Sequence, residues 1–215
     1  FNWQNEFPEV FANGGFDVVI GNPPYLRVQG LKENFEKESA FYEQHYMSAT
    51  ERFDYYVLFM EKAFGLIHKT GIQSFILPHK FINSSFGIGI RKFIYQNRAL
   101  NKLIHFGNNQ VFKDASVYTC IIVLSNGNNT FDYSKIMPEK ISQPFKSQNL
   151  SIDSISDCSP WVILDNTHTA ILKRLNNFPL KVKDVFKGIY QGIVSGDNKS
   201  FYLSDCVIDE AFVSK

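Results

Sequence analysis

Residues 16–25, with the sequence FDVVIGNPPY, constrain the fold of this chain more than any other segment. Apart from Asp17, the run Phe16–Ile20 is short, apolar and rich in β-branched residues, with Gly14 and Gly15 before it and Gly21 after it. This pattern predicts a β-strand buried on both faces, as in the parallel sheets of α/β proteins. An Asn-Pro-Pro-Tyr turn follows directly, so we expect the strand to end in a stiff loop.

The turn Asn22–Tyr25 has few backbone conformations available to it. Pro23 keeps Asn22 out of the α region, and Pro24 restricts Pro23 in the same way. Neither proline has an N–H group to donate, so the carbonyl groups of the loop are free to accept hydrogen bonds. They follow the carboxyl end of a strand, where open α/β sheets bind their ligands.

Two acceptors in this turn suit a planar amino group, which is a poor nucleophile because its lone pair is delocalised. The side-chain oxygen of Asn22 and the carbonyl oxygen of Pro23 can each accept one N–H bond and direct the lone pair at an electrophile. Tyr25 would stack on the attached ring. Such a site works by positioning and charge stabilisation, without a metal, and we expect a sulfonium methyl group as electrophile. The alternative is that Asn-Pro-Pro is ordinary loop sequence.

These residues resemble motif IV, the NPPY motif, of the amino-methyltransferases that use S-adenosylmethionine. The closest resemblance is to the gamma-class adenine-N6 DNA methyltransferases of restriction-modification systems, including the Taq-type and type IIG enzymes. The resemblance continues in chain order through Phe7–Phe11, Asp54–Tyr56, Ile76–Pro78, Val111–Lys113 and Val117–Leu124. It implies motifs IV to VIII, within the C-terminal half of a doubly wound, Rossmann-like α/β sheet.

The resemblance also implies roles for individual residues. Asn22 and Pro23 would hold the amino group of adenine, and Asn22 and Pro24 would lie beside S-adenosylmethionine. Tyr25 would stack on one face of the adenine and Phe112 on the other, although a core position for Phe112 is the alternative. The partner would be double-stranded DNA with a flipped adenine, because base flipping exposes an amino group that is paired and stacked in the duplex.

Strands and helices are expected to alternate up to about residue 126. The pattern predicts a helix from Asp54 to about Lys69 and a second helix capped by Ser84 or Ser85. The polar residues 27–50 predict an exposed flap between the turn and the first of these helices. Further strands are predicted at Ile72–Leu77, Lys102–Phe106 and Val117–Leu124, the last two forming a hairpin.

The predicted domain organisation has three parts. Residues 1–126 form a partial catalytic domain, and residues 127–179 form a linker that loses periodicity except for a helix near 167–176. Residues 180–215 open a target-recognition domain, because the glycine-rich run 188–201 resembles that domain of the gamma class. A locally basic stretch, which is either a DNA contact or a solvated surface, comprises Lys173, Arg174, Lys181, Lys183 and Lys187.

Composition narrows the remaining possibilities. The net charge of +1 neither indicates nor excludes a nucleic-acid partner. Three distant cysteines and five scattered histidines form no disulfide or metal pattern, and Cys120 is expected in the core. We expect a soluble, cytoplasmic protein, since no leader opens the chain and no apolar run approaches the roughly 18–20 residues that span a bilayer.

The donor-binding motif of the gamma class, a strand followed by Phe-x-Gly-x-Gly, is absent from residues 1–21. We therefore expect a fragment that transfers little or no methyl group alone. No acidic pair followed by Glu-x-Lys indicates a nuclease, so any nuclease of the parent protein would lie elsewhere. Two alternatives remain open: an amino-methyltransferase acting on protein glutamine or RNA guanine, and a catalytically incomplete DNA-binding or subunit-interaction module.

Overall fold

The computed structural model describes residues 1–27, 36–112, 117–157 and 159–163, together with 171, 174–175, 177–180 and 182–185. The chain divides into two compact units, Phe1–Ile163 and Leu164–Lys215. The first unit holds a six-stranded sheet, and the second contributes the short helix α8 (Val182–Val185). No helix among the described residues is long and apolar enough to cross a membrane.

The sheet has the strand order β1-β2-β4-β3-β5-β6. β1 is parallel to β2, while β4 is antiparallel to both β2 and β3, so β1, β2 and β3 run in the same direction. Helical crossovers join these three strands, which confirms the predicted Rossmann-like α/β fold and the antiparallel pairing of β3 with β4. The strands are β1 (Phe16–Gly21), β2 (Ile67–Pro78), β3 (Leu100–Gln110), β4 (Tyr118–Ser125), β5 (Thr130–Lys135) and β6 (Gln148–Ser151).

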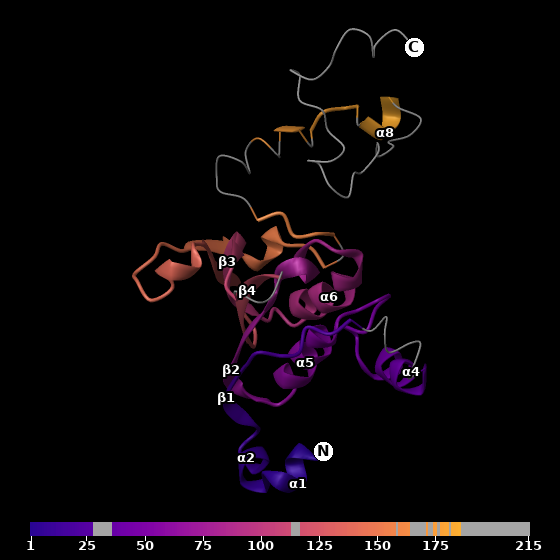
Figure 1. The fold of residues 1–215 in the computed structure, drawn as a ribbon, viewed down its shortest axis with the longest axis vertical. Helices are drawn as coiled ribbons and strands as arrows, with labels where there is room; N and C mark the ends of the chain where they lie inside the picture. The colour runs from indigo at the N-terminus through magenta and orange to yellow at the C-terminus, as the bar shows by residue number, and fades with distance from the viewer. Residues whose placement is uncertain are drawn as a thin grey trace, which may run out of the picture. The chain divides into compact units, whose positions relative to one another are not determined.

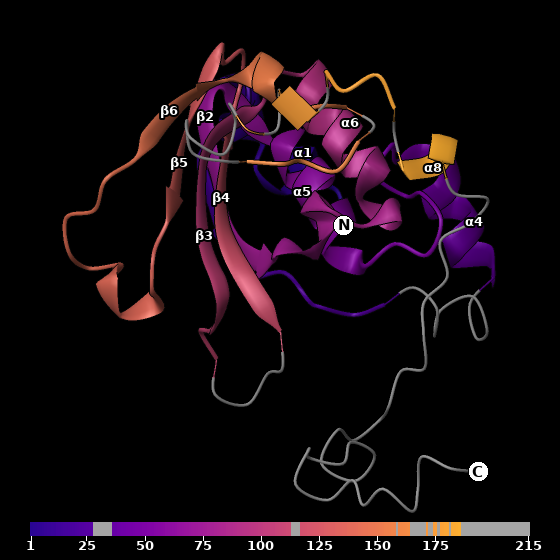
Figure 2. The same ribbon diagram turned by 90° about the horizontal axis from the view of Figure 1, so that it is seen from above.

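Helices α5 (Tyr55–Phe64) and α6 (Ile88–Gln96) cover one face of the sheet (Figures 1 and 2). Their inward side chains and those of β2, β3 and β4 form one fully buried core, which includes Tyr56, Met60, Leu77, Ile90, Leu103 and Ile122. The remaining helices of this unit are α1 (Trp3–Glu6), α2 (Pro8–Ala12) and α4 (Glu36–His45). Short 3-10 turns lie at His79–Ile82, Ser85–Gly87, Pro138–Lys140 and Ile152–Ser154.

The prediction that β1 is buried on both faces is wrong. Val19 packs against the core, but the side chains of Val18 and Ile20 on the opposite face are 56% and 78% exposed. Among the described strands, β1 lies at the end of the strand order and pairs with β2 alone, and helices α5 and α6 lie on the other face of the sheet from Val18 and Ile20 (Figure 2).

Two helix boundaries also differ from the prediction. α5 ends at Phe64 instead of Lys69, because Ile67, which fits the helical period, is the first residue of β2 and pairs with Phe16. Asp54 occupies the predicted N-cap position of α5 without a side-chain capping hydrogen bond. Neither Ser84 nor Ser85 caps α6, which begins at Ile88 after a 3-10 turn.

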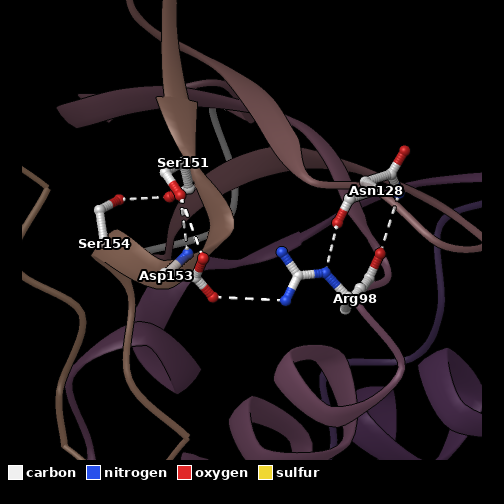
Figure 3. A network of polar contacts seen from close by, with 5 residues as sticks. All are labelled: Arg98, Asn128, Ser151, Asp153 and Ser154. Atoms are coloured by element: carbon white, nitrogen blue, oxygen red, sulfur yellow. Dashed lines mark hydrogen bonds and ion pairs between the residues drawn. The ribbon is translucent and has the colours of Figure 1, made fainter.

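The sequence predicted that regular structure is lost after residue 126. This prediction is wrong, because β5 and β6 extend the sheet. Figure 3 shows how this extension is attached to the end of α6. Arg98 donates from Nε to the carbonyl oxygen of Asn128 at 3.1 Å, and its Nη1 pairs with Asp153 Oδ1 at 3.3 Å. Trp161 is also buried, with its ring edge-on to Phe81. Residues 130–161 therefore belong to the same compact unit as the first four strands.

Several predicted features lie outside the described residues. These are most of the helix near 167–176, the glycine-rich run 188–201 and residues 28–35 of the predicted flap. Of the rest of that flap, residues 36–45 form α4.

Two glycines with positive φ provide a matched test of how β1 begins. At Gly15 (φ +124°), an added Cβ would lie 2.6 Å from the carbonyl oxygen of Leu66, whereas at Gly127 (φ +70°) it would meet nothing within 4 Å. We expect Gly127→Ala to lower the free energy of unfolding by about 1 kcal/mol, from backbone strain alone. Gly15→Ala should cost about 3 kcal/mol, because the clash with the β2 backbone adds to that strain. Urea unfolding measures both, and equal losses would show that the contact with Leu66 is unimportant.

Candidate functional site

The Asn-Pro-Pro-Tyr turn leaves β1 at the edge of the sheet where β2 ends and β4 begins. This follows from the parallel pairing of β1 with β2 and from the pairing of Pro78 with Thr119 across β2 and β4. Within the turn, Pro23 is buried and Tyr25 is partly buried, while Asn22 and Pro24 are exposed. The turn therefore lies at the carboxyl edge that the sequence predicted for a ligand site.

Tyr25 and the residues after it attach the turn to neighbouring elements. The hydroxyl group of Tyr25 donates a hydrogen bond to the carbonyl oxygen of Ile76 in β2, at 3.3 Å. Burial, with a smaller contribution from Cys120, raises the pKa of Tyr25 to about 12, so the phenol stays protonated as a donor at neutral pH. The carbonyl oxygen of Leu26 accepts from the amide of Tyr55 at 2.8 Å, which ties the turn to the start of α5.

Two cavities flank the turn, and its four residues are divided between them. Asn22, Pro23 and Pro24 line a cavity of about 590 Å³, whose other walls come mainly from apolar side chains of β1 and α5. Tyr25 lines a second cavity of about 270 Å³, which we call the Tyr25 cavity. The other residues that line the Tyr25 cavity are Arg27, Asp54, Pro78, His79, Lys80, Val117 and Tyr118.

His79 and Tyr118, which line the Tyr25 cavity, belong to a stack of rings that also includes His105. The centroid of His79 lies 4.4 Å from that of His105 and 6.1 Å from that of Tyr118, with interplanar angles of 17° and 15°. Burial lowers the pKa of His79, and burial with the nearby His79 and Lys135 lowers the pKa of His105 to about 4. Nδ1 of His105 also accepts a hydrogen bond from the amide of Gly107 at 2.9 Å. Both imidazoles are therefore neutral at pH 7.

Asp54 is the acidic residue of the Tyr25 cavity. Its burial raises the pKa of the carboxyl group, and the positive charges of Arg27 and Lys80 act in the opposite direction. Arg27 also forms a backbone bridge with Asp54. The cavity thus combines aromatic surface with two cations and one carboxyl group.

Phe112, the second stacking residue expected from the sequence, is not among the described residues that line either cavity. The sequence alone did not indicate that His79 and Tyr118 line this site. His79 directly follows the predicted strand end Ile76–Pro78, and Tyr118 lies at the start of the predicted strand Val117–Leu124, so both had a positional signal. The described residues contain no group of three His, Cys, Asp or Glu side chains that could hold a metal ion. Cys120 is fully buried, as predicted.

Comparison with known sequences identifies the family. Residues 1–112, just over half of the chain, match the profile of the Eco57I restriction-modification methylase family. The chain belongs to this family. Family membership confirms the resemblance inferred from the Asn-Pro-Pro-Tyr turn and the segments that follow it.

Individual relatives of this Eco57I-family chain are larger proteins. It is 29% identical to the type II restriction enzyme and methyltransferase RM.Eco57I of Escherichia coli, over 96% of the chain and 21% of that protein. It is 26% identical to the type II methyltransferase M.BstVI of Geobacillus stearothermophilus, over 96% of the chain and 40% of that protein. The chain therefore spans between about a fifth and two fifths of the length of these relatives.

A solved structure shares the fold of this Eco57I-family chain. It is a nuclease-deletion mutant of the type ISP restriction-modification enzyme LlaGI, solved in complex with a DNA substrate mimic. The TM-score is 0.52 at 16% sequence identity, and the likeness covers 77% of the present chain and 20% of LlaGI.

The neutral state of His105 makes stability depend on pH in a defined window. The unfolded chain takes up a proton at this side chain near pH 6.5, but the folded chain does so only near pH 4. Below pH 6.5 the unfolded state thus binds more protons, and the free energy of unfolding falls as the pH drops from about 6.5 to about 4. His105→Phe keeps a ring in the stack and should weaken this dependence. Thermal unfolding between pH 4 and 7.5 measures the pH dependence of stability. His68→Phe is the control, because His68 lies at the start of β2 and takes no part in the stack of rings. An unchanged dependence in His105→Phe would contradict the prediction.

Proposed function

We propose that this chain carries the amino-group site of a DNA methyltransferase that transfers a methyl group from S-adenosylmethionine to N6 of adenine, within a restriction-modification system. The observation that carries the proposal is the Asn-Pro-Pro-Tyr turn at the carboxyl edge of a Rossmann-like sheet, beside a cavity lined by Tyr25, in a chain of the Eco57I family. DNA is favoured over protein glutamine or RNA guanine because the relatives are enzymes of DNA restriction and modification, and LlaGI was solved with a DNA substrate mimic.

The proposed mechanism uses the positions of the turn residues. An adenine flipped out of the duplex enters the Tyr25 cavity and stacks on Tyr25. Its amino hydrogens are donated to Oδ1 of Asn22 and to the carbonyl oxygen of Pro23, which stabilises the positive charge that develops on N6. Pro23 is buried, so the loop that presents these acceptors is fixed before the base arrives. We also propose that Phe112, which follows β3, contacts the base.

The residues beside Asn22 and Pro24 fit only part of the donor. S-adenosylmethionine supplies an electrophilic methyl group when bound, and its ribose and amino-acid groups need polar partners. Lys62 is the one charged side chain among the described residues that line the 590 Å³ cavity, and no acidic side chain is available there for the ribose hydroxyls. The described lining fits apolar contacts near the turn, but it does not fit the ribose or the carboxylate and amine together.

We place the start of a target-recognition domain at residues 180–215 and the protein in the cytoplasm, as further parts of this proposal. The first follows from the resemblance of residues 188–201 to that domain of the gamma class, and the second is supported by relatives that belong to restriction-modification systems. The basic stretch near residues 173–187 would then contribute contacts to DNA phosphates.

Asn22→Ala, in the full-length gene product, should lower methyl transfer to DNA at least about 100-fold. The substitution removes one of the two acceptors that localise charge on the amino nitrogen. Binding of duplex DNA should change little, because phosphate contacts supply most of the affinity. Transfer of labelled methyl groups and a duplex-binding titration give the two readouts.

Asn126→Ala is the matched control for this experiment. Asn126 is an exposed asparagine beyond the far end of β4, where it donates one hydrogen bond to the carbonyl oxygen of Lys69. This variant should keep the activity of the unmodified protein. Normal methyl transfer by the Asn22→Ala variant would contradict the role assigned to Asn22.

The 215-residue chain on its own should incorporate no labelled methyl group into adenine-containing duplex DNA above background. The reason is the incomplete fit of its residues to the donor, together with the absence of a Phe-x-Gly-x-Gly loop before β1. The full-length protein assayed in parallel is the positive control. Robust methylation by the 215 residues alone would contradict the conclusion that their cavity lining does not fit the whole donor.

A further inference from the structure

Residues 79–87, which follow β2 and which we call the β2 turn, form part of the wall of the Tyr25 cavity. The first two residues of the turn, His79 and Lys80, line the cavity. The next residue, Phe81, is fully buried, and its ring lies edge-on to that of Trp161. The position of this wall therefore depends on how the β2 turn is held against the core.

Arg91 of α6 lies behind the β2 turn with only 1% of its surface exposed. Its Nη1 atom donates hydrogen bonds to the carbonyl oxygens of Phe81 and Ser84, both at 2.7 Å. A buried guanidinium group is costly to desolvate, and an aliphatic side chain would fill the same space without that cost. We propose that Arg91 is a positioning residue for methyl transfer, because it fixes the backbone of the β2 turn and with it one wall of the Tyr25 cavity. The inference rests on the proposed function.

Hydrogen bonds connect the carbonyl group that Arg91 holds to the residue that lines the cavity. Ser84 donates to the carbonyl oxygen of Lys80 twice, from its amide at 3.1 Å and from its hydroxyl group at 2.6 Å. The amide of Asn83 donates to the same oxygen at 3.3 Å. Arg91 therefore holds Ser84, and Ser84 in turn holds the backbone of Lys80.

Gly87 leaves the space that this arrangement needs. A Cβ at this residue would overlap the carbonyl oxygen of Phe81 and would lie 2.7 Å from Nη1 of Arg91. The end of the β2 turn thus packs directly against the guanidinium group and the carbonyl group that it binds. A turn held in this way is in place before a ligand arrives, and a misplacement of about 1 Å can slow a reaction by about 100-fold.

The experiment compares variants of the full-length protein well below their unfolding temperatures, with the folded fraction measured by circular dichroism. Arg91→Met keeps an unbranched side chain but has no N–H group to donate. We expect its kcat for methyl transfer to duplex DNA to fall about 10- to 100-fold per folded molecule, with KM for DNA and for S-adenosylmethionine changed less than about 3-fold. Arg91→Lys should restore kcat to within about 5-fold, because both hydrogen bonds leave one nitrogen atom and an ammonium group can also donate to two carbonyl groups.

Ile94→Ala is the matched control for a loss of stability. Ile94 is fully buried one turn further along α6, and its side chain donates no hydrogen bond. This variant should unfold more easily but keep kcat per folded molecule within about 2-fold. An unchanged kcat per folded molecule in Arg91→Met would overturn the inference. An equal loss in Ile94→Ala would overturn it too, because any defect in the core would then slow transfer.

Ser84→Ala tests the connection from Arg91 to Lys80 at a residue that is only partly buried. It removes the hydroxyl bond to the carbonyl oxygen of Lys80 and should lower kcat about 3- to 10-fold. Added to Arg91→Met, it should cause little further loss, because the two residues act on the same backbone. Losses that multiply would show independent effects and contradict the inference. If Arg91→Met does not fold, Ser84→Ala alone decides, and an unchanged kcat rejects the inference.

Failure of the inference and failure of the proposed function give different results. If the unmodified protein methylates adenine and Arg91→Met does so at the same rate per folded molecule, only the inference falls. If the unmodified protein methylates no adenine in any duplex, the proposed function falls and the inference falls with it.

Discussion

The parallel pairing of β1 with β2 determines where every other part of the site lies. Gly21 at the end of β1 pairs with Phe75 and lies against its ring, where a Cβ would come within 3.1 Å. The chain therefore leaves the sheet beside the end of β2, and the Tyr25 hydroxyl group donates to the carbonyl oxygen of Ile76. A shift of one residue in this register would direct the turn to the opposite face of the sheet.

The antiparallel strand β4 has a second consequence for the site. Because β4 runs opposite to its neighbours β2 and β3, it begins at the edge where they end, and Thr119 pairs with Pro78. This places Tyr118 beside His79, although the two residues are 39 positions apart along the chain. Helices α5 and α6 meanwhile bury one face of the sheet, so the Tyr25 cavity opens at the strand ends and not through the core.

Local sequence patterns predicted the elements whose conformation depends on neighbouring residues. Two prolines restrict the turn sterically, and the apolar runs of β2 and β4 have few alternatives to a strand. The predicted end of α5 was wrong because Ile67 fits both a helical period and the start of β2. The pairing of Ile67 with Phe16 decides in favour of the strand. The sequence did not predict β5 and β6, because both strands are short and largely polar. β5 pairs with β3 and buries Phe131, and β6 pairs with β5, so both strands depend on contacts between distant parts of the chain.

The sequence by itself determined the family resemblance, the stiff turn and the two acceptors of Asn22 and Pro23, because each depends on residues that are adjacent in the chain. The tertiary structure decided that Val18 and Ile20 are exposed, since this depends on which elements cover the sheet. It also decided that His79 and Tyr118, rather than Phe112, line the cavity with Tyr25 among the described residues. Strand order and direction bring those rings together, and neither can be read from a local pattern.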